Sequence, residues 1–255
     1  MAAQELSPRY DRIGEGYARK RHEDPRIAAL IAEALGDART VVNVGAGTGS
    51  YEPRDRHVVA IEPSDVMAAQ RPAELAPAIR GTAGRLPLRD ASVDAAMALL
   101  TVHHWEHEQE RGVRELRRVA RGPVILLTID PRVSGAMWLM ADYLPELAEL
   151  DHATFPPPET LADWLGASSI RTTVIEVPRD TPDGILLSFW AHPERVLDPA
   201  ARAATSGFAR MLPATVDRCV AAVERDLASG AWDARHGHLR DLDAYDAGLR
   251  LVVAD

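Results

Sequence analysis

The feature that most restricts what this chain can fold into is a glycine-rich turn placed directly after a run of β-branched residues. The run, Thr40–Val44, is typical of a buried strand, and residues 45–49 (Gly-Ala-Gly-Thr-Gly) follow it without a spacer. Glycines at such a turn let the backbone reverse sharply and let a ligand approach closely, because no Cβ intervenes. The pair predicts the first strand and the ligand loop of an open α/β sheet.

Further strands and helices are predicted in alternation. Apolar runs indicate strands at residues 58–62, 93–100 and 124–130, the last of them apolar on both faces as in the middle of a parallel sheet. Helical patterns lie between them, after Ser64 and at residues 106–120. Alternation at this spacing is typical of a doubly wound parallel sheet.

The second half of the sequence is less regular. It predicts helices at residues 134–150 and up to Leu165, a strand at residues 170–177, mostly helical structure at 183–246, and a closing strand at Leu249–Ala254. No stretch has the composition of a linker, so a single domain is expected over residues 1–255. Its expected parts are a cofactor-binding half at 10–131 and helical insertions on the substrate side at 132–168 and 183–246.

Charge and cysteine content narrow the function classes. The net charge of −9 disfavours a surface built for nucleic-acid phosphates or anionic lipids, because both reward clusters of Lys and Arg. No stretch approaches the roughly 20 apolar residues that span a bilayer, and residues 1–12 lack the apolar core of a signal peptide. Cys219 has no second cysteine with which to form a disulfide or a thiolate metal site. We expect a cytoplasmic monomer or homodimer that binds a small-molecule substrate and neither nucleic acid nor membrane.

The glycine loop has an acidic partner at the end of the next predicted strand. Glu62 stands where a carboxylate can accept the hydroxyls of a ribose lying across the strand ends; the alternative is a solvated strand terminus. A nicotinamide cofactor would require the pattern G-x-G-x-x-G/A, but counted from Gly45 its last position is Ser50. Glu52 and Pro53 also replace the basic or glycine-rich helix start that seats a pyrophosphate. A cofactor without phosphates, such as S-adenosyl-L-methionine, fits better.

Several segments together resemble one enzyme family. Residues 41–49, 59–64, 81–94, 99–105 and 115–119 occur in the order and spacing of class I S-adenosylmethionine-dependent methyltransferases, of the group similar to ubiquinone/menaquinone-biosynthesis enzymes. The resemblance covers about half of the chain. It implies a Rossmann-like, seven-stranded, mostly parallel sheet of order 3-2-1-4-5-7-6, with an antiparallel last strand and helical insertions over the substrate side.

The resemblance also implies a cofactor site. In such enzymes the glycine loop holds the methionine part, while Glu62 would bind the ribose and Pro63 and Met67 would flank the adenine. A turn at residues 83–86 would meet the adenine edge, two leucines would line the pocket beside the sulfonium, and tyrosines of an N-terminal helix would close over the cofactor. The residues assigned in this way are Tyr10, Tyr17, Gly45, Ala46, Gly47, Gly49, Glu62, Pro63, Met67, Ala83, Gly84, Leu86, Leu99 and Leu100.

The sequence departs from the family pattern at a few of these positions. Asn43 stands where an Asp is usual, and Thr82 and Gly84 stand where acids are common. The segment between Gly45 and Val58 is close to the minimum for a parallel crossover, so the first crossover helix must be very short.

His103, His104 and Trp105 follow the predicted strand at 93–100, at the sheet edge where ligands bind. A histidine there can take a proton from the acceptor as the methyl group moves. We expect His104, supported by His103, to be catalytic; the alternative is that the pair caps the next helix and packs under the cofactor. His107 lies at i+4 from His103 but without carboxylate support, so no metal is expected.

Aromatic residues of the second half are candidates for the substrate side. Trp138 and Tyr143 recur with two methionines at helical spacing, and Trp190 follows an apolar run. Such stripes belong either to the core or to a substrate pocket, and the family places substrate-covering elements here. The predicted function is methyl transfer from S-adenosyl-L-methionine to an O, N, S or C nucleophile of a small molecule, by in-line attack on the sulfonium methyl. The alternatives are a protein that binds this cofactor for non-methylating chemistry and a nucleotide-dependent oxidoreductase.

Overall fold

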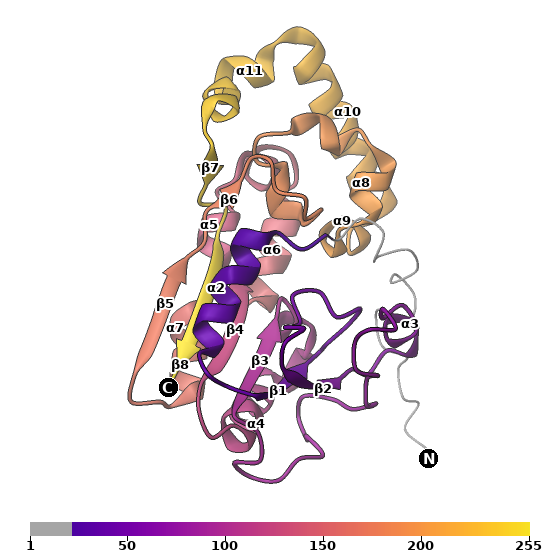
Figure 1. Cartoon of the computed structure of the whole chain (residues 1–255). Coiled ribbons are helices and arrows are strands. Elements are labelled where there is room, and N and C mark those ends of the chain that lie inside the picture. The colour runs from indigo at the N-terminus through magenta and orange to yellow at the C-terminus, as the bar shows by residue number, and fades with distance from the viewer. Residues whose placement is uncertain (1–21) are drawn as a thin grey trace.

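The computed structural model describes residues 22–255, and a six-stranded sheet forms its centre (Figure 1). The order across the sheet is β2-β1-β3-β4-β8-β5. The first four of these strands run parallel, while β8 is antiparallel to both of its neighbours. The doubly wound sheet and its antiparallel last strand are therefore confirmed. The strands are β1 (Thr40–Val44), β2 (His57–Ile61), β3 (Ala95–Leu99), β4 (Val124–Ile129), β5 (Ile170–Val174) and β8 (Leu249–Ala254).

The number of strands differs from the prediction of seven. Beyond β2, where the family order places one more strand, the pairing is reduced to an isolated bridge between Ile61 and Ile79. Pro77 lies two residues before Ile79, and Gly81 lies two residues after it. Proline cannot donate to a ladder and glycine weakens a strand, so the pairing does not extend. The order of the other six strands is as predicted.

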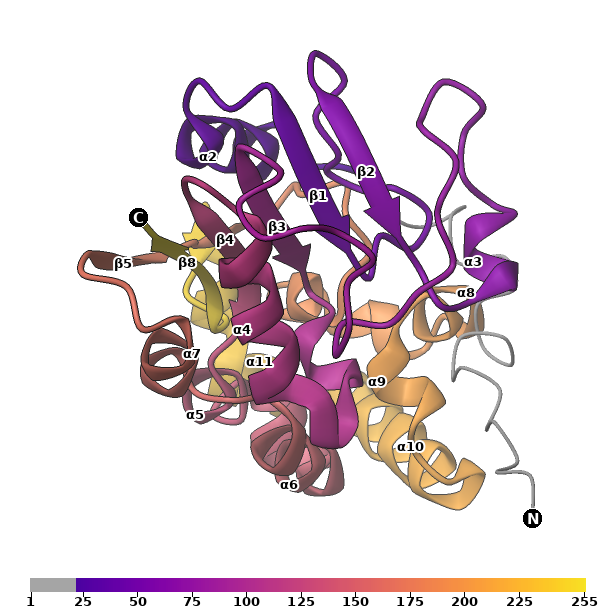
Figure 2. The same ribbon diagram turned by 90° about the horizontal axis from the view of Figure 1, so that it is seen from below.

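Helices cover both faces of the sheet (Figure 2). On one face, α2 (Pro25–Leu35) buries an apolar stripe in the same core cluster as Val41 and Met97. On the other face, α4 (Gln109–Val119) and α7 (Pro158–Leu165) belong to a cluster with Val42 and Ala96. Successive strand residues thus point to opposite helical layers, as the two-residue period of a strand requires.

A further layer of helices, most of them short, lies beyond the carboxyl ends of the parallel strands (Figure 1). A small two-stranded sheet of β6 (Val177–Pro178) and β7 (Ala244–Tyr245) lies between this layer and the main sheet. The helical elements of this region are α5 (Pro131–Ser134), a π-helical turn (Leu139–Tyr143), α6 (Pro145–Thr154), 3-10 turns at Leu186–Phe189 and Pro193–Val196, α8 (Pro199–Ala203), α9 (Ser206–Ala209), α10 (Pro213–Ser229), α11 (Ala231–His236) and a 3-10 turn at Gly237–Asp241.

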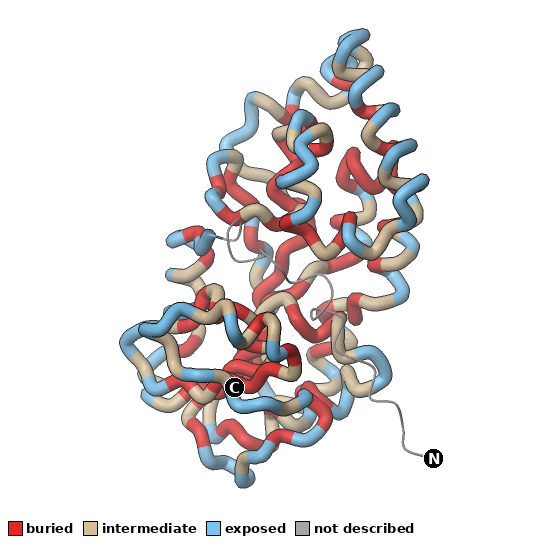
Figure 3. The backbone as a smooth tube through the Cα atoms, turned by 90° about the vertical axis from the view of Figure 1, so that its right-hand side faces the viewer, coloured by how far each residue is buried: buried red, intermediate tan, exposed pale blue. Residues whose placement is uncertain are grey.

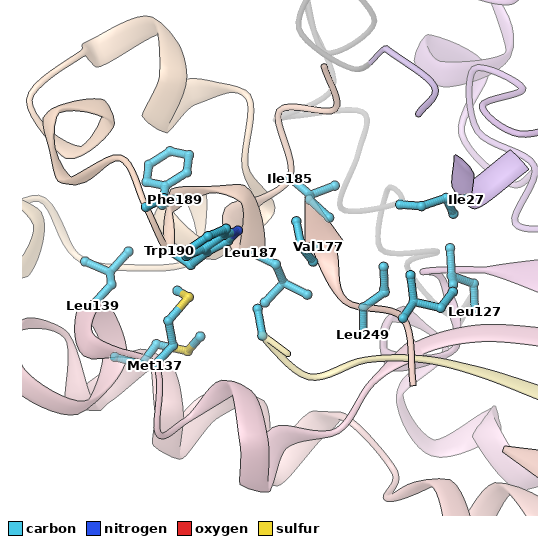
Figure 4. Close-up of a cluster of buried hydrophobic side chains, with 14 of the residues drawn as sticks. Ile27, Leu127, Met137, Leu139, Val177, Ile185, Leu187, Phe189, Trp190 and Leu249 are labelled. Atoms are coloured by element: carbon cyan, nitrogen blue, oxygen red, sulfur yellow. The ribbon is translucent and has the colours of Figure 1, made fainter. Parts of the chain in front are cut away.

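The apolar core runs without a break from the sheet into this layer. Figure 3 shows buried backbone continuing from one part to the other. Leu127 and Leu249 of the sheet share a cluster with Met137, Phe189 and Trp190 of the helical layer, as the close-up in Figure 4 shows. Within residues 22–255, no helix combines the length and apolar character needed to cross a membrane.

Candidate active site

The glycine loop takes the conformation that its sequence predicts. Gly45, Gly47 and Gly49 all have positive φ angles, of 71°, 52° and 92°. A Cβ on Gly45 would lie 2.1 Å from the hydroxyl oxygen of Thr101, which follows β3. Only glycine lets the loop lie this close to the end of β3. Gly45 therefore allows the loop to pack against the segment that carries the two histidines.

Glu62 clamps the loop from the end of β2. Its Oε2 accepts a hydrogen bond from Gly47 N at 2.8 Å, and its Oε1 accepts one from Ser64 N at 2.8 Å. The residue is buried, with 7% of its surface exposed, so the alternative of a solvated strand terminus is wrong. Two backbone donors fix the carboxylate in one orientation at the strand end, which suits recognition of a ribose.

A buried charge network lies beneath the loop. Glu52 accepts a hydrogen bond from Asn43 Nδ2 at 2.8 Å and pairs with Arg71 at 2.7 Å. Arg71 also donates to the backbone oxygen of Gly47 at 3.3 Å. Glu52 thus places a carboxylate next to Asn43, and Arg71 balances its charge. Neither Glu52 nor Arg71 was predicted from the sequence as a site residue.

The predicted adenine side is partly assembled. Met67 is buried, and its Cε lies 3.4 Å from the place of a Cβ on Gly47. Ser64 caps the short helix α3 (Asp65–Ala68) by accepting a hydrogen bond from Met67 N. Ala83 and Leu86 are buried in the core cluster below α4. At Gly84, where the family often has an acid, the Glu108 carboxylate lies where a Cβ would stand. Pro63 and Leu99 are half-buried, while Tyr10 and Tyr17 lie outside the described residues.

The histidines belong to a 3-10 turn, Val102–His104, that directly follows Thr101. His103 is buried and stacks on Phe155 of the segment after α6, with 3.9 Å between ring centroids and 18° between planes. His104 is half-buried, and its ring centroid lies 3.7 Å from that of His103. Gln109 holds the turn against α6, because its Nε2 donates to the carbonyl oxygens of Val102 and Thr154. His107 is exposed, and residues 22–255 contain no group of three side chains suited to a metal ion.

A cavity of about 60 Å³ adjoins this turn. Leu100 and His103 line it from the end of β3, and Asp151 and Arg210 line it from the helical layer. Leu100 has a φ of 51°, an uncommon conformation for a residue with a side chain, so the backbone leaves the sheet abruptly here. Backbone strain of this kind is frequent at functional sites.

The aromatic residues predicted for the substrate side lie in the core. Trp138 is buried and donates from Nε1 to the carbonyl oxygen of Trp190 at 2.8 Å. Trp190 is fully buried and stacks on Tyr245. Tyr143 donates to Asp226 at 2.9 Å. None of these three residues lines the 60 Å³ cavity. Met140, which lies between Trp138 and Tyr143 in the sequence, does line it.

Comparisons with known proteins agree with this geometry. Residues 42–127 match the family model of the methyltransferase domain. An uncharacterised methyltransferase of Mycobacterium tuberculosis (strain H37Rv) is 33% identical over an alignment of 141 residues that covers 48% of this chain and 54% of the relative. The chain thus spans about half the length of the curated relatives it matches.

Solved structures extend the likeness over nearly the whole chain. A proposed methyltransferase of an antibiotic biosynthesis pathway from Anabaena variabilis is 30% identical, with a TM-score of 0.83 over 92% of this chain and 99% of that one. An S-adenosylmethionine-dependent methyltransferase from Thermotoga maritima, 23% identical, has a TM-score of 0.54 over 68% of this chain and 86% of its own, which shows the shared fold alone. The chain therefore belongs to the class I S-adenosylmethionine-dependent methyltransferase family.

Proposed function

We propose that this enzyme methylates a small-molecule acceptor bound in the cavity between the end of β3 and the helical layer. The observation that carries the proposal is the close approach of Gly45 to Thr101, which brings the cofactor loop against the segment after β3 that carries Leu100 and His103. Two adjoining sites, one for the cofactor and one for an acceptor, are what methyl transfer requires. The same arrangement supports a small acceptor, because the volume of the cavity is only about 60 Å³.

The residues around the loop fit the cofactor's chemistry. Gly45, Ala46, Gly47 and Gly49 would accommodate the methionine part, in a tight loop where a Cβ on Gly45 would collide with Thr101 and one on Gly49 with Leu75. Glu62 would hold the ribose, and Met67 with Pro63 would border the adenine. Leu86 and the backbone of Ala83 and Gly84 would meet the adenine edge, and Leu99 and Leu100 would face the sulfonium. Asn43 Oδ1 is buried and has no hydrogen-bond partner among the described residues, so it offers an acceptor to a donor group of the cofactor.

When bound, the cofactor supplies an electrophilic methyl group on sulfur. The contribution of the chain is then to position the acceptor, exclude water and take up a proton where the nucleophile carries one. We assign the proton to His104, which lies beside His103, the histidine that lines the cavity and stacks on Phe155. Trp138, Tyr143 and Trp190 would shape the helical layer from behind rather than touch the acceptor. We further propose that the protein acts in the cytoplasm.

Calorimetry tests the cofactor assignment. S-adenosylhomocysteine should bind, and NADH should not, because the loop runs into Glu52 and Pro53 and offers no seat for a pyrophosphate. Binding of NADH in preference to S-adenosylhomocysteine would contradict the proposal. For the histidine, the change His104→Gln should keep S-adenosylhomocysteine affinity and reduce turnover by roughly 10²–10⁴-fold. Full turnover in a folded Gln variant would remove His104 as the base.

A further inference from the structure

The cavity beside His103 has a mainly apolar wall, to which Thr205 and Ser206 add hydroxyl groups and Asp151 and Arg210 add charges. Its walls include Leu100, Ile129, Met140 and Phe155, and the short turns around Leu186 and Gly207 cover it. At about 60 Å³ it has room for a few water molecules, and the unbranched side chain of Met140 can give way to a larger guest. An apolar pocket with a few placed polar groups is the usual form of a small-molecule site.

The charged part of the cavity wall is a buried ion pair. Asp151 of α6 accepts a hydrogen bond from Arg210 Nη1 at 3.0 Å, and both side chains are 7% exposed. Arg210 Nη2 also donates to Thr154 Oγ1 at 2.9 Å. Among the described residues, Arg210 is the one side chain that donates to the Asp151 carboxylate. A carboxylate has about four acceptor positions, so Asp151 retains capacity for another donor.

The neighbours of Asp151 offset the cost of burying its carboxylate only in part. Burial raises the pKa of the Asp151 carboxyl to about 6 even though Arg210 and His152 act to lower it. The carboxylate is therefore poorly solvated where it stands, and a hydrogen bond from a guest would relieve that cost. Because Asp151 and Arg210 balance in charge, the pocket as a whole favours a neutral guest over an ion.

We propose that Asp151 is the specificity anchor of the acceptor pocket, and that the acceptors are mostly apolar, uncharged molecules carrying a hydrogen-bond donor such as a phenolic hydroxyl. This rests on the proposed function, since it takes the cavity for the acceptor site. The donor binds Asp151, and the apolar part fills the space between His103, Phe155 and Met140. Arg210 is a positioning residue that holds the carboxylate in place.

The test uses the full chain and three ring compounds of similar size. Phenol offers a donor, toluene offers none, and benzoate offers an anion; their binding is measured by ligand-detected NMR and calorimetry with and without saturating S-adenosylhomocysteine. We expect phenol to bind about tenfold or more tightly than toluene, as for a hydrogen bond to a charged group, and benzoate to bind least. Asp151→Asn should abolish the preference for phenol and leave toluene binding unchanged. The matched control is Glu146→Gln. Glu146 lies on α6 like Asp151, but its ion pair with Arg218 of α10 is exposed.

A second variant covers the case in which Asp151→Asn does not fold. Asp151→Leu/Arg210→Met removes both charges, which buried pairs often tolerate, and should raise toluene binding while losing phenol selectivity. A phenol preference that survives in either variant would overturn the anchor. A preference for benzoate would transfer the role to Arg210, and binding of none of the three would remove the cavity as an acceptor pocket. Failure of S-adenosylhomocysteine to bind would instead count against the proposed function, because the ring compounds are also measured without it.

Discussion

Arg71 and Glu52 form an ion pair beneath the glycine loop, with 2.7 Å between Nη2 and Oε2 and side chains only 4% and 0% exposed. The pair connects the segment after α3 to the segment after the loop, and Arg71 reaches the loop backbone itself at Gly47. Glu52 in turn orients Asn43: a carboxylate only accepts, so the amide must present its NH₂ group to it. The loop is thus held from below by side chains as well as by its glycines.

The first prediction removes the cation of this pair. Arg71→Met leaves the Glu52 carboxylate buried without its counter-charge, which typically costs about 3–5 kcal/mol of unfolding free energy. S-adenosylhomocysteine affinity should fall as well, because the loop loses its support. Urea denaturation and calorimetry measure the two effects. Arg80→Met is the matched control, since the Arg80–Asp65 pair is exposed and should contribute at most about 1 kcal/mol. Equal effects of the two substitutions would contradict a supporting role for Arg71.

The second prediction concerns Glu62. Glu62→Gln replaces an acceptor by an NH₂ group that faces one of two backbone donors, Gly47 N or Ser64 N. We expect S-adenosylhomocysteine to bind roughly 10–100-fold more weakly, the range for a lost hydrogen bond to a charged group. The unfolding midpoint without ligand should also drop, because the carboxylate is buried and closes the loop. Glu74→Gln, at an exposed site nearby, should change neither quantity. A Gln variant with unaltered affinity would exclude Glu62 from the cofactor site.

The parts of the fold that could be predicted are those whose signals are local. Glycine spacing predicts the loop at residues 45–49, and continuous apolar runs predict the strands β1 and β4. Each of these signals is contained within a few residues. The strand order followed from the family resemblance rather than from any local pattern. The absence of the seventh strand from the described residues also has a local cause, in Pro77 and Gly81. The prediction of seven strands followed the family resemblance and did not take these two residues into account.

The parts that could not be predicted depend on contacts between distant residues. Asp151 and Arg210 are 59 positions apart, and each is an ordinary charged residue in its own segment. Glu52 and Arg71 are 19 positions apart and carry no pattern that marks them as partners. Trp138 and Trp190 were ambiguous in the sequence because a stripe of large apolar residues fits a pocket lining and a core equally well. Only the packing of the helical layer, which places both in the core, separates the two.

The third prediction uses the single cysteine as a probe of the helical layer. Cys219 lies on α10 with no exposed surface, and burial raises the pKa of its thiol to about 11. At about pH 8 only on the order of one such thiol in a thousand is ionised, and the thiolate is the reactive form. We expect iodoacetamide to leave the native protein unmodified by mass spectrometry while labelling it fully in guanidinium. Rapid labelling of the native protein would mean that α10 opens readily from the core.

The last prediction concerns pH and Asp151. The pKa of its carboxyl is raised from 3.8 to about 6 in the folded protein, chiefly by burial. An acid whose folded-state pKa is raised stabilises the fold most below its unfolded pKa, and that contribution is lost as the pH rises through the folded pKa. The groups that face it are Arg210 and His152, with His103 across the same cavity, and the first two lower its pKa without cancelling the effect of burial.

Asp151→Asn removes this titration. The unfolding free energy of wild type relative to the Asn variant should therefore fall by on the order of 3 kcal/mol between about pH 3.8 and about pH 6, as 1.36 kcal/mol per pKa unit implies. Urea denaturation of both proteins across this range measures the difference, which is insensitive to the many carboxylates they share. Glu146 gives the opposite sign: its pKa is lowered, mainly by Arg218, so the stability it contributes is lost as the pH falls. If wild type and Asp151→Asn kept a constant difference in unfolding free energy across the range, Asp151 would be solvated in solution, and its buried position beside the cavity would be wrong.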